Sequence, residues 1–182
     1  MTHKVIENGR EHGLIFKPRP SKGWVWLLCL AMLLFSIGTV LPLPDHSPWW
    51  MVTLSIGLSA LLGLVFLAFA AWFPTMRYEL DDTALTLIYG PVLKYRIPLA
   101  QIRGMQCRNL NVAFWSSVHF PGLVLFTVPY SDVGEMKMCA TAVNDNILVI
   151  GTDDALYGIT PADEAAFVTA LQTRINNTAT LI

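Results

Sequence analysis

The sequence predicts a membrane α-hairpin followed by an all-β or α+β domain, in which about seven short antiparallel strands form a small barrel or sandwich capped by one C-terminal helix. Three observations lead to this prediction. From residue 24 to residue 73 the only formally charged side chain is Asp45. After residue 74 apolar and polar residues alternate, which is the period of strands that bury one face. Beyond residue 160 the period lengthens to that of an amphipathic helix.

Residues 1–23 are predicted to form a basic cytoplasmic tail, because they contain five Lys or Arg against two Glu. Residues 74–182 have the opposite balance, with seven Lys or Arg against ten Asp or Glu. Nucleic acid selects clustered cations, whose binding releases phosphate counterions. The acidic balance of the larger part therefore argues against a nucleic-acid partner.

Residues 24–73 are predicted to form a transmembrane hairpin. The first span, residues 24–41, is uncharged, and as a helix it is about 27 Å long, close to the ~30 Å hydrocarbon core of a bilayer. The second, residues 49–73, is about 37 Å long and must tilt. The external loop, residues 42–48, contains three prolines that separate the helices. Amphipathic tryptophans stand at the span ends: Trp24, Trp26, Trp49, Trp50 and Trp72.

Two other interpretations of these apolar segments are a cleaved signal peptide and two core helices of a soluble protein. The first span is too long for a signal peptide and no small-x-small cleavage site follows it.

The orientation in the membrane follows from the basic residues. Five Lys or Arg precede the first span, none lies in the loop, and Arg77 follows the second span. The excess of basic residues on one side predicts a multi-pass protein of the cell (cytoplasmic or inner) membrane with both termini in the cytoplasm.

The second span carries a stripe of small residues, Ser55, Ser59 and Gly63, spaced four residues apart. Such a stripe lets helix backbones approach closely. Two interpretations remain open at this point: contact with another copy or a partner, and packing against the first span of the same molecule.

Residues 74–182 are predicted to form the cytoplasmic domain, and residues 75–182 to fold alone, because their local signals agree. Turn-forming Gly, Pro, Asp, Asn and Ser residues separate the apolar runs, which predicts an antiparallel meander. The seven predicted strands are residues 76–80, 84–89, 92–98, 122–128, 135–143, 146–151 and 155–160.

One helix is predicted to close the chain. Thr160 is its candidate N-cap, Pro161 occupies the first helical position, and Asp163 lies near the positive end of the dipole. Asn176 and Asn177 are predicted to end it. The apolar face that covers the sheet comprises Phe167, Val168, Leu171 and Ile175.

Three segments together resemble the bacterial pleckstrin-homology-like (PH-like) domain family over roughly residues 76–175: VGEMKMCAT (133–141), ILVI (147–150) and YGITPAD (157–163), followed by Phe167. The resemblance implies the PH fold, and it implies a membrane-anchored member, since members often have N-terminal helices. Its motifs are patterned hydrophobic and turn residues, so it transfers no catalytic residue.

We expect no enzyme, no catalytic residue, no cofactor and no metal, because the sequence has no nucleophile, metal-ligand or phosphate-loop motif. The aspartate pairs at 81–82 and 153–154 are interpreted as solvated turn residues. The first pair stands where PH domains place phosphoinositide-binding cations, which disfavours phosphoinositide binding. The three cysteines, Cys29, Cys107 and Cys139, are interpreted as buried thiols.

Residues 112–130 contain no formal charge. One interpretation is buried strands with a connecting loop. The other is an exposed aromatic patch of Phe114, Trp115 and Phe120, which meets a partner, a second copy or the bilayer.

These features favour a non-enzymatic membrane-anchored scaffold or adaptor, whose cytoplasmic domain binds a membrane-associated protein or further copies of itself as a homo-oligomer. The alternative is a protein that handles a lipid or small molecule in a groove between hairpin and domain. The spans contain serine and threonine but no ionisable residue, which weakens a transport role.

Overall fold

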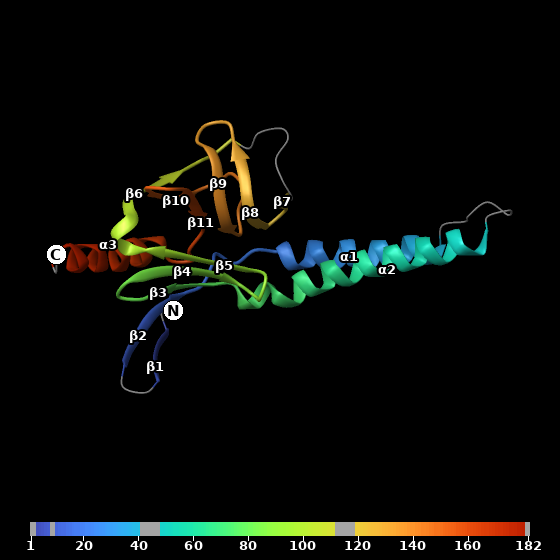
Figure 1. Ribbon diagram of the computed structural model, residues 1–182, viewed down its shortest axis with the longest axis horizontal. Helices are drawn as coiled ribbons and strands as arrows, with labels where there is room; N and C mark the ends of the chain where they lie inside the picture. The colour runs from blue at the N-terminus through green and yellow to red at the C-terminus, as the bar shows by residue number, and fades with distance from the viewer. Residues whose placement is uncertain (1–2, 8–9, 41–47, 112–118, 181–182) are drawn as a thin grey trace. The chain divides into compact units, whose positions relative to one another are not determined.

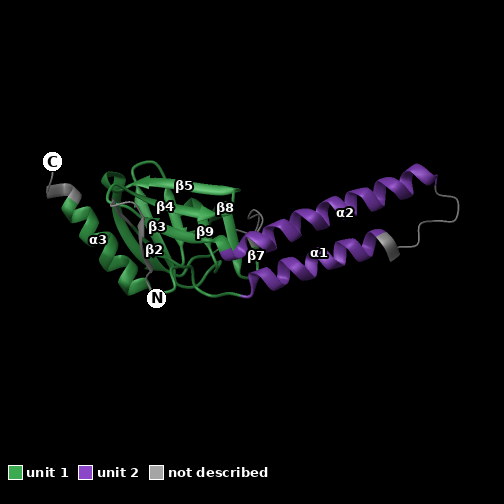
Figure 2. Cartoon of the chain, turned by 90° about the horizontal axis from the view of Figure 1, so that it is seen from below, with its two compact units in different colours: residues 1–21, 75–182 green, residues 22–74 purple. Residues whose placement is uncertain are grey.

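The computed structural model describes residues 3–7, 10–40, 48–111 and 119–180. The chain divides into two compact units, one formed by residues 1–21 with 75–182 and the other by residues 22–74 (Figure 2). We call them the sheet domain and the helical hairpin.

The helical hairpin consists of α1 (Gly23–Val40) and α2 (Trp49–Trp72), which pack against each other. A 3-10 turn, η1 (Phe73–Thr75), follows. Among the described residues one helix, Trp49–Thr75, is long and apolar enough to cross a membrane, with a mean hydropathy of 2.3. The apolar part of α1, Gly23–Gly38, is shorter. Both predicted helices are therefore present, and their bounds agree with the prediction to within one residue.

Small residues hold the two helices of the hairpin together. A Cβ atom added to Gly38 would lie 2.8 Å from the Cβ atom of Ser59, and one added to Gly63 would lie 2.9 Å from the Phe35 ring. Gly63 is buried, whereas Ser55 is exposed. Two residues of the predicted stripe thus pack against α1 of the same molecule, as the second interpretation of the stripe required.

We expect Gly63→Leu to separate the helices, because the added side chain has to displace Phe35, at a cost of about 1–3 kcal/mol. Gly57→Leu is the matched control on the same helix, since a Cβ atom there meets nothing within 4 Å. Thermal unfolding of both variants in mild detergent, followed by circular dichroism, measures the difference. Equal melting temperatures for the two variants would contradict this packing.

The sheet domain contains a five-stranded sheet in which the order β1-β2-β3-β4-β5 follows the chain (Figure 1). All its neighbouring strands are antiparallel. Its strands are β1 (His3–Glu7), β2 (Arg10–Phe16), β3 (Arg77–Leu80), β4 (Ala84–Tyr89) and β5 (Leu93–Pro98).

A second sheet has six strands in the order β6-β10-β11-β9-β8-β7. Its strands are β6 (Ile102–Arg108), β7 (His119–Phe120), β8 (Leu123–Tyr130), β9 (Gly134–Ala140), β10 (Ile147–Thr152) and β11 (Leu156–Ile159). The 3-10 turn η2 (Leu99–Gln101) leads into β6, and α3 (Glu164–Thr180) ends the described chain. The two sheets do not close into a barrel.

Seven of these strands, β3–β5 and β8–β11, confirm the predicted ones to within three residues at either end. The predicted meander is wrong in one respect, because β9 and β11 pair in parallel, with Lys137 opposite Tyr157. The prediction also missed β6. Only Ile102 of its seven residues is buried, so the strand has no period of two to recognise.

Residues 1–21 are part of the sheet domain. The prediction that residues 1–23 form a separate tail is therefore wrong. In β2, Leu14 pairs with Leu80 and Phe16 with Tyr78 of β3. The Arg19 N–H donates to the Thr160 carbonyl over 2.7 Å. The hairpin is thus inserted between β2 and β3, two strands that are hydrogen-bonded neighbours.

Aromatic rings join the two sheets to α3. The buried Tyr78 hydroxyl donates to the Cys139 carbonyl of β9 over 2.8 Å and accepts from the Thr160 N–H over 3.3 Å. Burial raises the pKa of this hydroxyl, which stays protonated. The Phe167 ring packs edge-on against Phe16, 5.0 Å between centroids, and lies 6.3 Å from Tyr78.

The helix α3 begins later than predicted. Asp163 is its cap, since Oδ1 accepts from the Ala166 N–H over 3.0 Å. The Thr160 hydroxyl instead accepts from the Thr141 N–H over 2.8 Å. The helix also continues past Asn176 and Asn177 to Thr180.

Candidate functional site: a groove along β6

The strand β6 is an edge of the six-stranded sheet. On one side it pairs with β10, with Met105 opposite Ile150 and Gln106 opposite Val149. On its other side no strand pairs with it among the residues that the structure describes. Backbone N–H and C=O groups on a free edge are able to pair with an extended chain.

Two hollows adjoin β6, and we call them together the β6 groove. The first has a volume of about 420 Å³ and lies between β6 and α3. The second has a volume of about 430 Å³ and extends over the sheet toward β10 and β11. The first is lined by Ile102, Arg103, Gly104, Met105, Gln172, Ile175 and Asn176. The second is lined by Gly104, Met105, Gln106, Arg108, Val133, Val149, Gly151 and Leu156.

Glycines leave the backbone of the groove bare where the two hollows meet. Gly104 of β6 pairs with Gly151 of β10. A Cβ atom at Gly104 would meet nothing within 4 Å, so the space above it is open. Missing side chains thus contribute to the hollow, and another backbone is able to approach the strand closely here.

Among the described residues that line the groove, the charged ones are Arg103 and Arg108. The remaining lining is apolar, amide or glycine. Arg108 makes no ion pair with any described residue. The groove therefore combines apolar and amide side chains with a cationic side chain near each end of β6.

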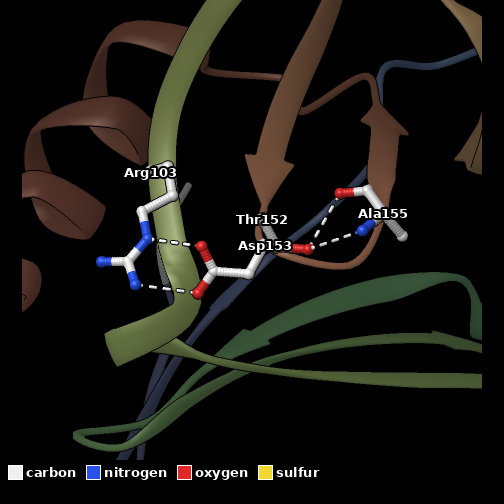
Figure 3. A network of polar contacts seen from close by, with 4 residues as sticks. All are labelled: Arg103, Thr152, Asp153 and Ala155. Atoms are coloured by element: carbon white, nitrogen blue, oxygen red, sulfur yellow. Dashed lines mark hydrogen bonds and ion pairs between the residues drawn. The ribbon is translucent and has the colours of Figure 1, made fainter.

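A two-pronged ion pair fixes Arg103. Its Nε and Nη2 atoms donate to the two carboxylate oxygens of Asp153 over 2.7 and 2.8 Å (Figure 3). The hydrogen bond from Arg103 lowers the pKa of Asp153, and the same contact raises the pKa of Arg103. Both side chains are exposed, so the pair contributes more to the orientation of Arg103 than to stability.

Asp153 belongs to the turn between β10 and β11, which the Thr152 side chain closes. There the Thr152 hydroxyl donates to the Ala155 carbonyl over 2.9 Å and accepts from its N–H over 3.1 Å (Figure 3). All four aspartates of the two pairs are exposed turn residues, as interpreted, and two of them also bind an arginine. Asp153 binds Arg103, and Asp82 accepts a hydrogen bond from Arg174 of α3.

Four of the six residues predicted as interaction sites belong to the described structure, three on α2 and one on β7. Ser59 and Gly63 face α1, and Ser55 lies on the same helix with its side chain exposed. Phe120 belongs to β7 and is half-buried. Phe114 and Trp115, the other two predicted residues, lie outside the described part of the chain.

The prediction of buried thiols holds for one cysteine of three. Cys139 is buried, and burial raises its pKa to about 12. Cys29 and Cys107 are exposed. Cys107 lies on β6 and donates to the Asn146 side chain over 2.7 Å. Its pKa is raised to about 11, first by desolvation and then by Glu164. Cys107 and Cys139 are therefore protonated and weakly nucleophilic at neutral pH.

Among the residues that the structure describes, no group of three or more His, Cys, Asp or Glu side chains is placed to hold a metal ion. The features of the β6 groove are instead those of a binding surface: a free strand edge, apolar walls and two cationic side chains. The β6 groove could not be predicted from the sequence, because its formation depends on the order of the strands in the sheet.

Comparison with known proteins identifies a family that this chain matches. The model of a family described as "Bacterial PH domain" matches residues 76–175, which is more than half of the chain and runs from the start of β3 into α3. No curated protein matches the chain, and no solved structure does.

Proposed function

The chain belongs to the bacterial PH domain family, and from that premise we propose that it is a non-enzymatic, membrane-anchored binding module. The helical hairpin is the anchor. The β6 groove takes an extended acidic segment of a partner protein.

The surface of the hairpin supports a lipid environment. With the exceptions of Val92 and Phe126, every large apolar side chain that is exposed in the described part of the chain lies on α1 or α2. Trp49 is 79% exposed and Leu54 is 64% exposed. Monomeric soluble proteins rarely expose contiguous apolar surface on this scale. Hydrocarbon chains cover such surface without cost, and helices satisfy their own backbone groups in lipid.

The position of the hairpin in the chain is the observation that carries the proposed topology. Because β2 and β3 are hydrogen-bonded neighbours, the chain must return from the hairpin to the side on which it left. A single crossing would separate the two strands, so either both helices cross or neither does. Since α2 has the length and hydropathy to cross, we infer that both do. The basic residues before α1 then favour the cytoplasm as the side of the domain.

Single cysteines in the full-length protein test the anchor, in a background of Cys29→Ala and Cys107→Ala. We expect an impermeant maleimide to label Asp45→Cys in intact cells, and to label Thr83→Cys only after the membrane is opened. The protein is also expected to stay with membranes at alkaline pH. Release at alkaline pH, or labelling of Thr83→Cys in intact cells, would contradict the proposed topology.

The lining of the groove supports an acidic, extended partner segment. A segment that adds to the free edge of β6 presents alternate side chains to the groove. On one face of β6, Met105 and Ile175 line the first hollow together with Arg103. On the other face, Val149 lies with Arg108 in the second hollow. Each hollow therefore suits an apolar side chain and an acidic one. Acidic residues on a partner therefore complement both ends of the strand.

Immobilised peptides test this preference with the full-length protein in mild detergent. Peptides that alternate Val with Glu are expected to bind more tightly than peptides that alternate Val with Lys. Arg108→Glu is expected to weaken binding of the Glu series about tenfold, since a charge-assisted hydrogen bond contributes about 1.5–3 kcal/mol. The control is Lys94→Glu, which makes the same charge change on β5. Equal losses from the two variants would contradict binding at β6.

Self-association stays a prediction. Self-association through the small-residue stripe of α2 is no longer supported, because Ser59 and Gly63 pack against α1 of the same molecule. Self-association through the sheet domain was predicted from residues 112–130, of which residues 112–118 lie outside the described structure.

A further inference from the structure

Two turns of the sheet domain are tied to the residues at which the chain leaves for α1 and returns from α2. The Ser21 hydroxyl donates to the Gly122 carbonyl over 2.6 Å, in the turn between β7 and β8. The Thr75 hydroxyl accepts from the Gly90 N–H over 2.9 Å, in the turn between β4 and β5. That second turn is closed by a hydrogen bond from the Val92 N–H to the Tyr89 carbonyl.

Covalent reach keeps both turns near the ends of the hairpin. Ser21 precedes the start of α1 at Gly23 by two residues, and Thr75 follows the end of α2 at Trp72 by three. A fully extended chain spans at most ~3.6 Å per residue. Ser21 therefore lies within about 7 Å of the start of α1, and Thr75 within about 11 Å of the end of α2. If the helices cross a bilayer, that distance is within the headgroup layer or about one Debye length of it.

The residues at this end of the domain suit a bilayer surface. The β4–β5 turn presents Pro91 and Val92, and Val92 is 37% exposed, one of two large apolar side chains exposed in the described part of the domain. The β7–β8 turn presents the half-buried Phe120 and the exposed Pro121.

Cations lie at the same end as these turns. Lys94 pairs with Ile88, which pairs with Arg77 at the start of β3, so Lys94 lies at the end of the sheet where α2 enters it. Lys17 follows directly after β2. Both lysines are exposed, and neither makes an ion pair with a described residue. The acid on this part of the sheet, Glu79, is paired with Arg77.

We propose that these two turns form a second membrane contact, in which Val92 and Phe120–Pro121 enter the headgroup layer and Lys17 and Lys94 bind anionic lipid headgroups. The proposal rests on the membrane anchor proposed above and adds to it. Apolar insertion combined with cationic attraction is the usual basis of interfacial binding, and the anchor removes most of the entropic cost of bringing the turns to the surface.

The contact orients the β6 groove toward the cytoplasm. The Leu99 N–H donates to the Thr83 carbonyl, so η2 and the start of β6 lie at the opposite end of the sheet, beside the β3–β4 turn. Arg174 of α3 binds Asp82 in that same turn. The hollow between β6 and α3 therefore opens at the end of the domain away from the two membrane-binding turns.

A polarity-sensitive dye on the full-length protein in vesicles tests the contact. Val92→Cys and, as a matched control, Thr83→Cys are labelled with NBD in the background without Cys29 and Cys107. In vesicles of phosphatidylcholine with phosphatidylglycerol, we expect the dye at residue 92 to emit at shorter wavelength and to be quenched by nitroxide-labelled lipid. The dye at residue 83 is expected to behave as in water. Adding Lys17→Glu and Lys94→Glu is expected to reverse the shift at residue 92.

The outcomes separate the contact from the anchor, because co-flotation of the protein with the vesicles is measured in the same samples. A protein that floats while its dye at residue 92 is as exposed to water as the dye at residue 83 overturns the second contact and leaves the anchor standing. A shift at residue 92 without quenching by nitroxide lipid also overturns it, since a protein surface then covers the turn. A protein that does not float overturns the anchor itself.

Discussion

Phe167→Ala is expected to lower the free energy of unfolding of the sheet domain by about 3–5 kcal/mol. The ring is fully buried where α3 meets the five-stranded sheet. It contacts Phe16 of β2 and Tyr78 of β3, so its loss leaves a cavity lined by side chains from both strands. Typical domain stabilities are 5–15 kcal/mol, so this single change removes a large part of the total.

Hydrogen exchange of the full-length protein in mild detergent measures this loss, because the most protected amides of β3 and β9 report global unfolding of the domain. Val168→Ala is the control on the neighbouring position of α3, where the side chain is only half-buried. We expect it to cost much less. A loss below about 1 kcal/mol for Phe167→Ala would mean that the helix does not dock as described.

The elements with strong local signals were predictable from the sequence. The uncharged runs defined α1 and α2. Segments in which apolar and polar residues alternate, bounded by turn-forming residues, defined the strands from β3 to β5 and from β8 to β11. Phe167 was recognised because it repeats with helical period alongside Leu171. In each case the information lies within about ten consecutive residues, which is the length over which pattern and propensity act.

The elements that were missed depend on partners far away in the chain. The apolar part of β2 is only Leu14, Ile15 and Phe16, and its neighbour β3 comes after the whole hairpin. The parallel pairing of β9 with β11 is likewise non-local. Thr160 and Asp163 are both good capping residues, and the choice between them is made by Thr141, which takes the Thr160 hydroxyl.

The β6 groove was beyond sequence reasoning for a further reason. It consists of an unpaired strand edge and of open space above Gly104, and neither is visible as a motif. The sequence did contain Arg103 and Asp153, but their pairing depends on β6 lying next to β10. The order of strands in a sheet is decided by the global fold.

Residues 75–182 alone are expected to be largely unfolded, contrary to the expectation from local signals. The fragment lacks β2, and with it the Phe16 ring that packs on Phe167. It also loses the hydrogen bonds that residues 17–21 make across the domain, from Arg19 to Thr160 and from the Ser21 side chain to Gly122. Removal of one buried Phe ring costs about 3–5 kcal/mol and each lost hydrogen bond about 1 kcal/mol, so together they approach the whole stability of a typical domain.

A protein in which residues 22–74 are replaced by a flexible linker is expected to fold, because it restores both segments of the sheet domain in one chain. A Gly/Ser linker of about 12 residues has a root-mean-square span of about 20 Å, and the ends that it joins both belong to the same compact unit. Urea titration followed by circular dichroism is expected to show a cooperative β-sheet transition for the linked protein and none for residues 75–182. Adding a peptide of residues 10–21 to the fragment is expected to recover part of the transition. Equal stability of the fragment and the linked protein would mean that β2 is dispensable, and the hairpin would then no longer be held at both ends by one sheet.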